Sequence, residues 1–138
     1  MTGFTLKTAA GHIIRFRYYT EAPITATAFD ALPPFTRTFM HARISGQEIW
    51  TDRAPELNII QENASVFTIP GELVYGPSMP LRSKTRNAMG IYYGEGKRLY
   101  AGNIFATVVK EDIHLPITLG EQIWKGGVAE ITFERSED

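Results

Sequence analysis

Short segments in which apolar and polar residues alternate, separated by Gly, Pro and Asn, run along most of this sequence. A period of two residues is typical of β-strands with one buried face. It predicts eight strands, over 4–7, 13–18, 36–44, 47–51, 73–75, 88–93, 104–109 and 129–134. Because closing a sheet removes its exposed edges, eight short strands favour a closed or nearly closed β-barrel.

Two segments have the four-residue apolar spacing of helices instead. The first covers 22–32, where Pro23 suits a first-turn position and Pro33 and Pro34 prevent continuation. The second begins near Leu115 and ends at the two glycines 126–127. The apolar residues of these two helices are Ile24, Ala28 and Leu32, then Leu115, Leu119 and Ile123. We therefore expect a mainly β fold with two α-helices.

Length and composition narrow the function classes. The 138 residues include no Cys, which excludes disulfides, thiolate nucleophiles and iron–sulfur clusters, and they predict one domain over 1–138. A net charge of −1 disfavours nucleic-acid binding. No apolar run approaches the roughly 20 residues of a membrane span, and residues 1–10 lack the pattern of a secretory signal. We expect a cytoplasmic protein without nucleic-acid or membrane partners.

Metal and cofactor signals are weak. The histidines, His12, His41 and His114, lie in different segments without ligand spacing, so no metal site is predicted. Gly94 and Gly96 begin a dinucleotide-binding pattern whose third glycine is missing, so no cofactor is predicted either.

The segment 38–51 contains the most informative group of side chains. Read as two strands joined by a two-residue loop at Ser45 and Gly46, it pairs residues across the hairpin. We call the four residues that this register brings to one face the hairpin set: His41, Arg43, Glu48 and Trp50. A guanidinium, a carboxylate, an imidazole and an indole together predict a site for a small polar or anionic molecule. The alternative is an ordinary Arg43–Glu48 ion pair beside a stacked His41 and Trp50.

Two other regions contribute candidates. Tyr92, Asn103 and Phe105 lie on predicted strands and are candidate ligand contacts, although aromatic residues at strand spacing more often belong to the core. The irregular stretch 76–87 contains three basic residues, Arg82, Lys84 and Arg86, and no acidic one. It is predicted to lie at the rim of the Arg43 site and to attract anions. The alternative is a solvated loop with its charges in water.

Several short sequence motifs resemble those of proteins with the cyclophilin fold, an eight-stranded barrel closed by two helices. The segment 21–29 is similar to the opening of the first cyclophilin helix, 71–75 to a strand entry, and 99–109 to the segment in which Phe105 would hold the aromatic position. The whole chain more closely resembles a bacterial family of small cyclophilin-like proteins of unknown function, through 41–49, 62–63, 70–73 and 101–107. The resemblance implies a closed eight-stranded cyclophilin-like β-barrel with two α-helices.

Cyclophilins that isomerise prolyl bonds use an Arg on an F-H-R-I strand, and the resemblance makes Arg43 the candidate for it. The following F-x-x-Q-G-G-D phrase is replaced by 47–52, and the strand at 89–93 lacks the expected Gln. Isomerase activity is therefore not expected. Our prediction is binding of, or action on, a small polar or anionic metabolite around Arg43. The alternatives are prolyl isomerisation and a non-catalytic subunit or structural homo-oligomer.

Overall fold

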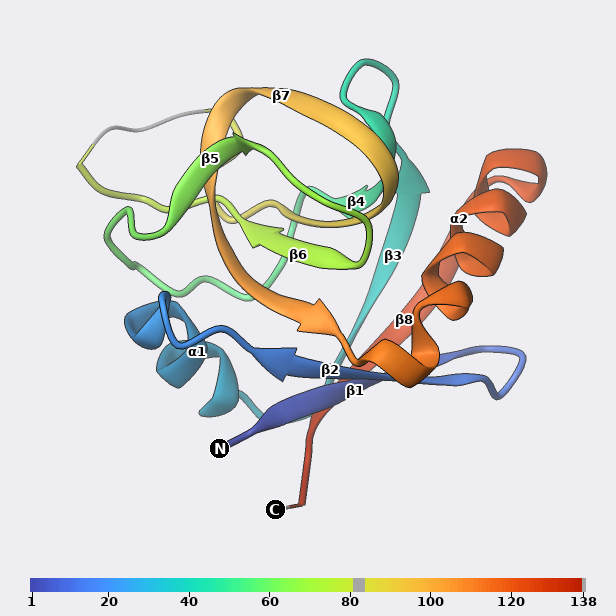
Figure 1. Cartoon of the computed structure of the whole chain (residues 1–138), viewed down its shortest axis with the longest axis horizontal. Coiled ribbons are helices and arrows are strands. Elements are labelled where there is room, and N and C mark those ends of the chain that lie inside the picture. Colours follow the sequence, from blue (N-terminus) through green and yellow to red (C-terminus); the bar gives the residue numbers. More distant parts are fainter. Residues whose placement is uncertain (81–83, 138) are drawn as a thin grey trace.

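The computed structural model describes residues 1–80 and 84–137 and has a mainly β fold with two α-helices, as predicted (Figure 1). The strands are β1 (Gly3–Thr8), β2 (Ile13–Tyr18), β3 (Phe35–His41), β4 (Gly46–Thr51), β5 (Ala64–Phe67), β6 (Glu72–Tyr75), β7 (Met89–Val108) and β8 (Ala129–Arg135). The helices are α1 (Pro23–Asp30) and α2 (His114–Gly126), the latter preceded by a 3-10 turn, η1 (Lys110–Asp112).

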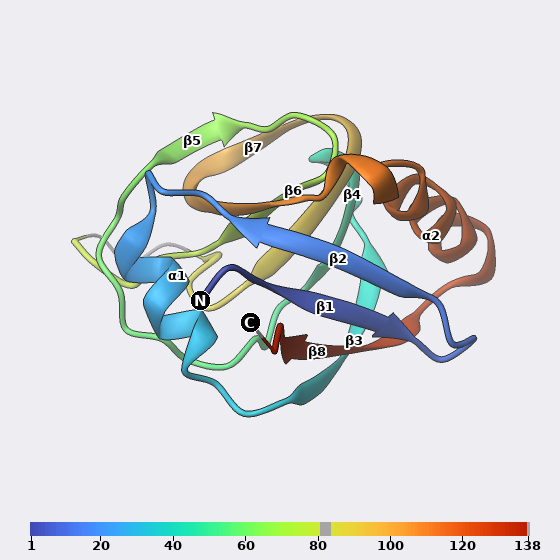
Figure 2. The same cartoon turned by 60° about the horizontal axis from the view of Figure 1, so that its bottom comes forward.

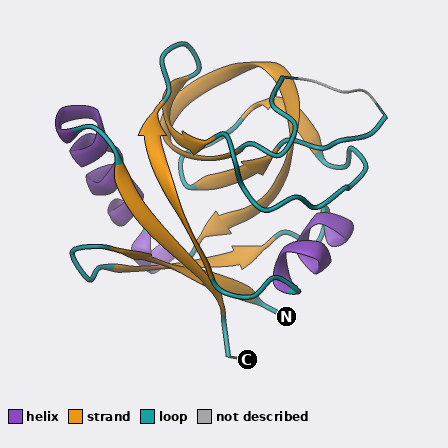
Figure 3. Ribbon diagram, turned by 180° about the vertical axis from the view of Figure 1, so that it is seen from behind, coloured by secondary structure: helices purple, strands orange, loops and turns teal. Residues whose placement is uncertain are grey.

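The eight strands pair antiparallel, and the pairing closes on itself. The order runs β2-β1-β8-β3-β4-β7, and β7 then pairs with β2 between Phe16 and Val108. Figure 2 shows β2, β1 and β8 side by side, and Figure 3 shows the two helices on opposite sides of the molecule. Aromatic side chains, with Phe4, Phe105 and Phe133 almost fully buried, fill the core that this ring encloses. The closed ring of hydrogen bonds agrees with the closure expected from the strand count.

Strand β7 differs most from the prediction. The sequence predicted two strands, over 88–93 and 104–109, but the structure has one strand of 20 residues that curls back on itself (Figure 1). Both halves of the curl flank β6, so that Leu73 pairs with Ile91 on one side and Ala106 on the other. Strand β5, which was not predicted, pairs with the curl. The middle of the curl forms an arc above the outer face of the sheet, which is the face turned away from the core.

The β3–β4 hairpin also differs. The predicted strand over 36–44 ends at His41, and Gly46 already belongs to β4, so the turn is longer than two residues. Met40 pairs with Trp50 and His41 with Ile49, which shifts the predicted register by one residue. The shift arises because Gly46 adopts a φ of +101° and pairs with Gly96 of β7 instead of forming the turn.

The helices fall where they were predicted, with one change of face. Pro23 occupies the first turn of α1, and Gly127, with a φ of +100°, ends α2. In α1 the residues buried most are Thr25, Ala26 and Phe29, whereas Ile24 of the predicted apolar face is 51% exposed. Leu119 and Ile123 of α2 are buried as expected. Neither helix of the described residues has the length and apolar character needed to cross a membrane.

Candidate functional site

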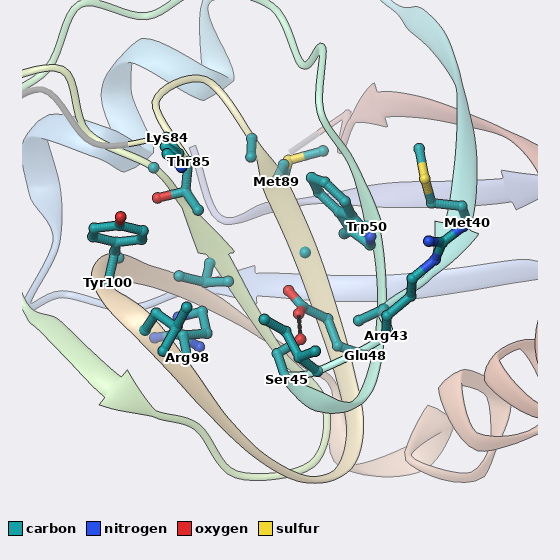
Figure 4. A pocket seen from close by; sticks show the side chains of 18 of the residues that line it. Met40, Arg43, Ser45, Glu48, Trp50, Lys84, Thr85, Met89, Arg98 and Tyr100 are labelled. Atoms are coloured by element: carbon teal, nitrogen blue, oxygen red, sulfur yellow. Dashed lines mark hydrogen bonds between the residues drawn. The ribbon is translucent and has the colours of Figure 1, made fainter.

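A cavity of about 510 Å³ opens on the outer face of β4 and β7, turned away from the core residue Ile49 (Figure 4). The turn after β3 borders it on one side, and the arc 98–102 of β7 borders it on the other. Its lining residues are Met40, His41, Ala42, Arg43, Ile44, Ser45, Glu48, Trp50, Val74, Gly76, Lys84, Thr85, Ala88, Met89, Gly90, Arg98, Leu99, Tyr100 and Gly102. The curl of β7 and the β3–β4 hairpin therefore form the site together.

The walls of this cavity are mostly apolar. Met40, Trp50 and Met89 lie on the hairpin side, and Tyr100 lies across from them on the arc (Figure 4). Glycine keeps the floor open, because a Cβ on Gly90 would come within 1.8 Å of a Glu48 carboxylate oxygen. Such a cavity suits a ligand with an apolar body, since apolar walls gain by excluding water.

Glu48 places an acid at the floor of this apolar cavity. The residue is 7% exposed, and Ser45 Oγ donates a hydrogen bond of 2.5 Å to its Oε1. Burial raises the pKa of the Glu48 carboxyl above its ordinary value, and the hydroxyls of Ser45 and Tyr92 and the charge of Arg98 offset this rise only in part. A carboxyl with these surroundings can bind a cation when ionised or donate a hydrogen bond when protonated.

Arg98 supplies the half-buried cation of the site. Its guanidinium lies over the ring of Tyr92, 5.3 Å from the centroid, and Nη2 donates to the carbonyl oxygen of Ser65. Nε and Nη1 are buried without a hydrogen-bond partner. Because an unpaired buried donor is costly, an added acceptor would stabilise this guanidinium.

Two exposed cations of the described residues add to the charge of the cavity. Arg43 extends along the hairpin side and Lys84 lies above the arc (Figure 4). Within the described part of the chain the only ion pair joins Arg15 to Asp112 at 2.9 Å, so the predicted Arg43–Glu48 pair is not formed. The correction follows from the register, because Ala42, not Arg43, lies opposite Glu48 and donates its N–H to the Glu48 carbonyl at 2.9 Å.

The predicted common face of the hairpin set is therefore only partly formed. Glu48 and Trp50 share the outer face, whereas His41 pairs with the core residue Ile49 and turns its ring the other way. Its Nδ1 lies 2.8 Å from the Ala42 carbonyl oxygen, which only accepts, so Nδ1 donates this hydrogen bond, and Nε2 lies 2.6 Å from the Tyr93 hydroxyl. His41 borders the cavity, where its Nδ1 contacts the lining residue Ala42, and the rest of its ring contacts Tyr93 and Trp124, which lie outside the cavity.

Three other candidates, Tyr92, Asn103 and Phe105, do not line the cavity. Phe105 belongs to the core, as the alternative interpretation expected, and Tyr92 is fully buried beneath Arg98. Burial is the main cause that raises the pKa of Tyr92 to about 12. Asn103 is also fully buried, and its amide donates to Thr25 Oγ1 at 3.0 Å and to the Ile60 carbonyl at 2.9 Å. Its role is to connect β7 to α1.

The basic stretch 76–87 reaches the site in part. Lys84 lines the cavity. Arg86 is exposed and is not among the lining residues. Arg82 lies outside the described residues.

A comparison with known protein families shows to which family this chain belongs. The family described as "Protein of unknown function (DUF3830)" matches residues 5–135, nearly the whole sequence. The chain belongs to the DUF3830 family. No curated protein matches it.

Two solved structures resemble the fold of this DUF3830 chain. The structure of McbB in complex with tryptophan has a TM-score of 0.72 and 17% sequence identity over 98% of this chain. The chain spans about 45% of the McbB chain. The solution structure of the hypothetical protein AF2241 from Archaeoglobus fulgidus has a TM-score of 0.67 and 16% identity, covering 98% of this chain and 95% of the other. At these identities the likeness concerns the fold alone.

Sequence reasoning missed several pocket residues of this DUF3830 chain, above all Arg98. Arg98, Leu99 and Tyr100 lie in the middle of the β7 curl, a stretch that was predicted as a connection between strands. Met40 was placed on the opposite face by the one-residue error in register. Alternation counted from Gly90 places Arg98 and Tyr100 on the outer face only if the strand continues through Gly94 and Gly96, which the local sequence does not indicate.

The site's chemistry is that of polar recognition. In the part of the DUF3830 chain that the structure describes, no group of three or more His, Asp or Glu side chains is placed to hold a metal ion. The groups available are one buried carboxyl, one half-buried guanidinium, two exposed cations and an apolar wall. They can bind and orient a charged molecule, and Glu48 can exchange a proton with it.

Proposed function

We propose that this DUF3830 protein binds a small anionic metabolite with an apolar body, and that its ring of strands is a cyclophilin-like barrel carrying the site on its outer face. The observation that carries the proposal is the half-buried guanidinium of Arg98, whose Nε and Nη1 have no partner, in a cavity with apolar walls. A carboxylate or phosphate is the group that matches its planar donors.

The balance of charge supports an anion. Among the described residues, Arg43, Lys84 and Arg98 line the cavity, and Glu48 is the one acid that does. With Glu48 ionised the lining keeps an excess of two positive charges, and with Glu48 protonated an excess of three. Positive charge in a cleft with low-dielectric walls raises the local concentration of anions.

The size and walls of the cavity support an apolar body. Ligand cavities commonly enclose about 300–1,000 Å³, and this one encloses about 510 Å³. Trp50 and Tyr100 lie on opposite sides of it, so that a planar ring can contact either face (Figure 4). Since McbB, which shares the fold, has been solved in complex with tryptophan, an indole carrying a carboxylate is a suitable first probe.

Titration calorimetry with indole-3-propionate, 3-phenylpropionate and inorganic phosphate tests this proposal. We expect the two aromatic carboxylates to bind, and Arg98→Gln to weaken them by roughly tenfold or more, because a hydrogen bond to a charged group contributes about 1.5–3 kcal/mol. The matched control is Lys97→Gln, which removes a neighbouring exposed cation that does not line the cavity. Trp50→Ala is expected to weaken the aromatic probes and to leave phosphate unaffected.

Two results would contradict the proposal. One is the absence of binding by all three probes in the wild-type protein. The other is binding that Arg98→Gln and Lys97→Gln weaken equally, since this would indicate a general effect of net charge instead of recognition in the cavity.

A further inference from the structure

We infer that the ligand of this pocket also carries a positively charged nitrogen, so that it is an α-amino acid with a large apolar side chain. The inference rests on the proposed function and names the ligand class of the same site. It is carried by the position of the Glu48 carboxylate, which accepts a hydrogen bond from Ser45 but which an anion alone would leave without a counter-charge.

The first step is the geometry of Glu48. Its Oε1 accepts the hydrogen bond of Ser45, whereas Oε2 lies over the bare backbone of Gly90 and accepts no hydrogen bond from the described residues. The Tyr92 hydroxyl is buried nearby, yet it has no hydrogen-bond partner of good geometry. One carboxylate oxygen at the floor of the cavity is therefore available to a ligand.

The second step is the missing counter-charge. Lining cations surround Glu48, but none of the described ones forms an ion pair with it. A buried carboxylate without a paired cation is costly and tends to hold a proton. A ligand that brings an ammonium group supplies the charge and the hydrogen-bond donors together.

The third step is the arrangement of the positive and negative charges in the cavity. Figure 4 shows Glu48 between Arg98 on one side and Arg43 on the other. An α-amino acid carries its ammonium and carboxylate on one carbon, so the first can face Glu48 while the second faces either guanidinium. Its side chain is then left for the apolar wall at Trp50. An amine without a carboxylate would leave the guanidiniums without an anionic acceptor, and an acid without an amine would leave Glu48 without a counter-charge.

Three indoles of matched size separate these cases: L-tryptophan, indole-3-propionate without the ammonium, and tryptamine without the carboxylate. We expect L-tryptophan to bind at least about tenfold more tightly than either of the others, as each lacks one charge-assisted contact. Glu48→Gln should remove most of the advantage of L-tryptophan over indole-3-propionate. Glu95→Gln, an exposed acid outside the lining, is the control and should leave both affinities unchanged.

The pH dependence provides a second readout on the wild-type protein. An ammonium beside Glu48 favours the ionised carboxylate, so L-tryptophan binding should strengthen as the pH rises above the ordinary carboxyl value of 4.5 and release protons within that range. An anion favours the protonated carboxyl, so indole-3-propionate should weaken over the same range. Calorimetry in two buffers of different ionisation enthalpy measures the proton release directly.

The outcomes are distinguishable. If indole-3-propionate binds as tightly as L-tryptophan, with the same pH dependence, the inference is overturned and the proposed function stands. The inference also fails if Glu48→Gln, verified as folded by circular dichroism, weakens both ligands equally. If none of the indoles binds, the inference is overturned, and the proposed function falls as well if 3-phenylpropionate and phosphate also fail to bind.

Discussion

At the residue scale, Gly90 determines whether the floor of the cavity can hold a carboxylate. A Cβ at this position would lie 1.8 Å from Glu48 Oε2, so the acid must move if any side chain is added. We predict that Gly90→Ala lowers the free energy of unfolding by about 1–3 kcal/mol, the usual cost of overpacking a filled site. It should also weaken any ligand that contacts Glu48. Urea denaturation and calorimetry measure the two effects.

The control for this substitution is Gly126→Ala. A Cβ on Gly126, in the last turn of α2, would meet nothing within 4 Å. Alanine there should leave the free energy of unfolding unchanged or slightly higher. Equal stability of the Gly90→Ala and Gly126→Ala proteins would show that Glu48 can move at no cost.

The Arg15–Asp112 ion pair leads to a prediction for acid stability. The Arg15 side chain and backbone donate hydrogen bonds of 2.9 Å to Asp112, and this hydrogen-bonded cation lowers the pKa of Asp112 below its ordinary 3.8. A carboxylate with a lowered folded-state pKa stabilises the fold above its unfolded pKa, and the contribution is lost as the pH falls through the folded value.

We therefore predict that Asp112→Asn destabilises the protein at pH 7 and that this difference from wild type shrinks as the pH falls below 3.8. Urea denaturation of both proteins at pH 7 and at low pH measures it. A difference that stays constant over this range would assign the effect to packing and not to the charge of Asp112.

At the scale of elements, helix α1 is capped by a residue from a distant segment. Its N-cap residue Ala22 offers no side-chain hydrogen bond, and Glu62 instead accepts from the backbone N–H groups of Ile24 and Thr25, at 3.2 and 2.8 Å. We predict that Glu62→Ala costs about 1–2 kcal/mol of unfolding free energy, as the loss of a good helix cap does. Thermal and urea denaturation measure the loss. Gln61→Ala, an exposed neighbour, is the control, and an equal loss in both variants would contradict a capping role.

The alternation of polar and apolar residues predicted those strands whose two faces differ in polarity. Strands β1 and β2 were found at nearly their observed bounds, and Pro23 and Gly127 delimited the helices. The curl of β7 was missed because the predicted strands ended at residue 93 and resumed at 104, whereas Gly94 and Gly96 lie within one strand and allow close approach to Gln47 and Tyr92. A strand that bends through its glycines does not differ in local sequence from two strands and a loop.

The candidate site was predicted less completely than the fold. Arg43, Glu48 and Trp50 were found because they lie within one hairpin, where sequence spacing implies spatial proximity. The error in register came from Gly46, whose pairing with Gly96 depends on contacts distant in sequence. Arg98 was missed for the same reason, since the curl alone brings it across from the hairpin.

For the whole molecule, the comparison with prolyl isomerases gives a further prediction. The chain lacks the Gln residues of their signature, and the cavity near Arg43 has the buried acid Glu48 at its floor. An ionised acid beside the reacting amide opposes the stabilisation that a guanidinium gives. We predict no acceleration of cis–trans exchange in a proline-peptide assay. Catalysis that Arg43→Ala abolishes, while Arg37→Ala leaves it intact, would reverse this conclusion.

Closure of the strand ring also has a consequence for how the chain reaches its native state. Strand β1 lies between β2 and β8, so Phe4 pairs both with Phe16 nearby and with Arg135 at the other end of the sequence. The β1–β2 hairpin can form early, but it stays incomplete until β8 and β7 are available on its two sides. Such non-local topologies fold in about milliseconds to seconds, because loop entropy is lost before the long-range contacts compensate for it. Completion of the ring therefore requires β8 to be present.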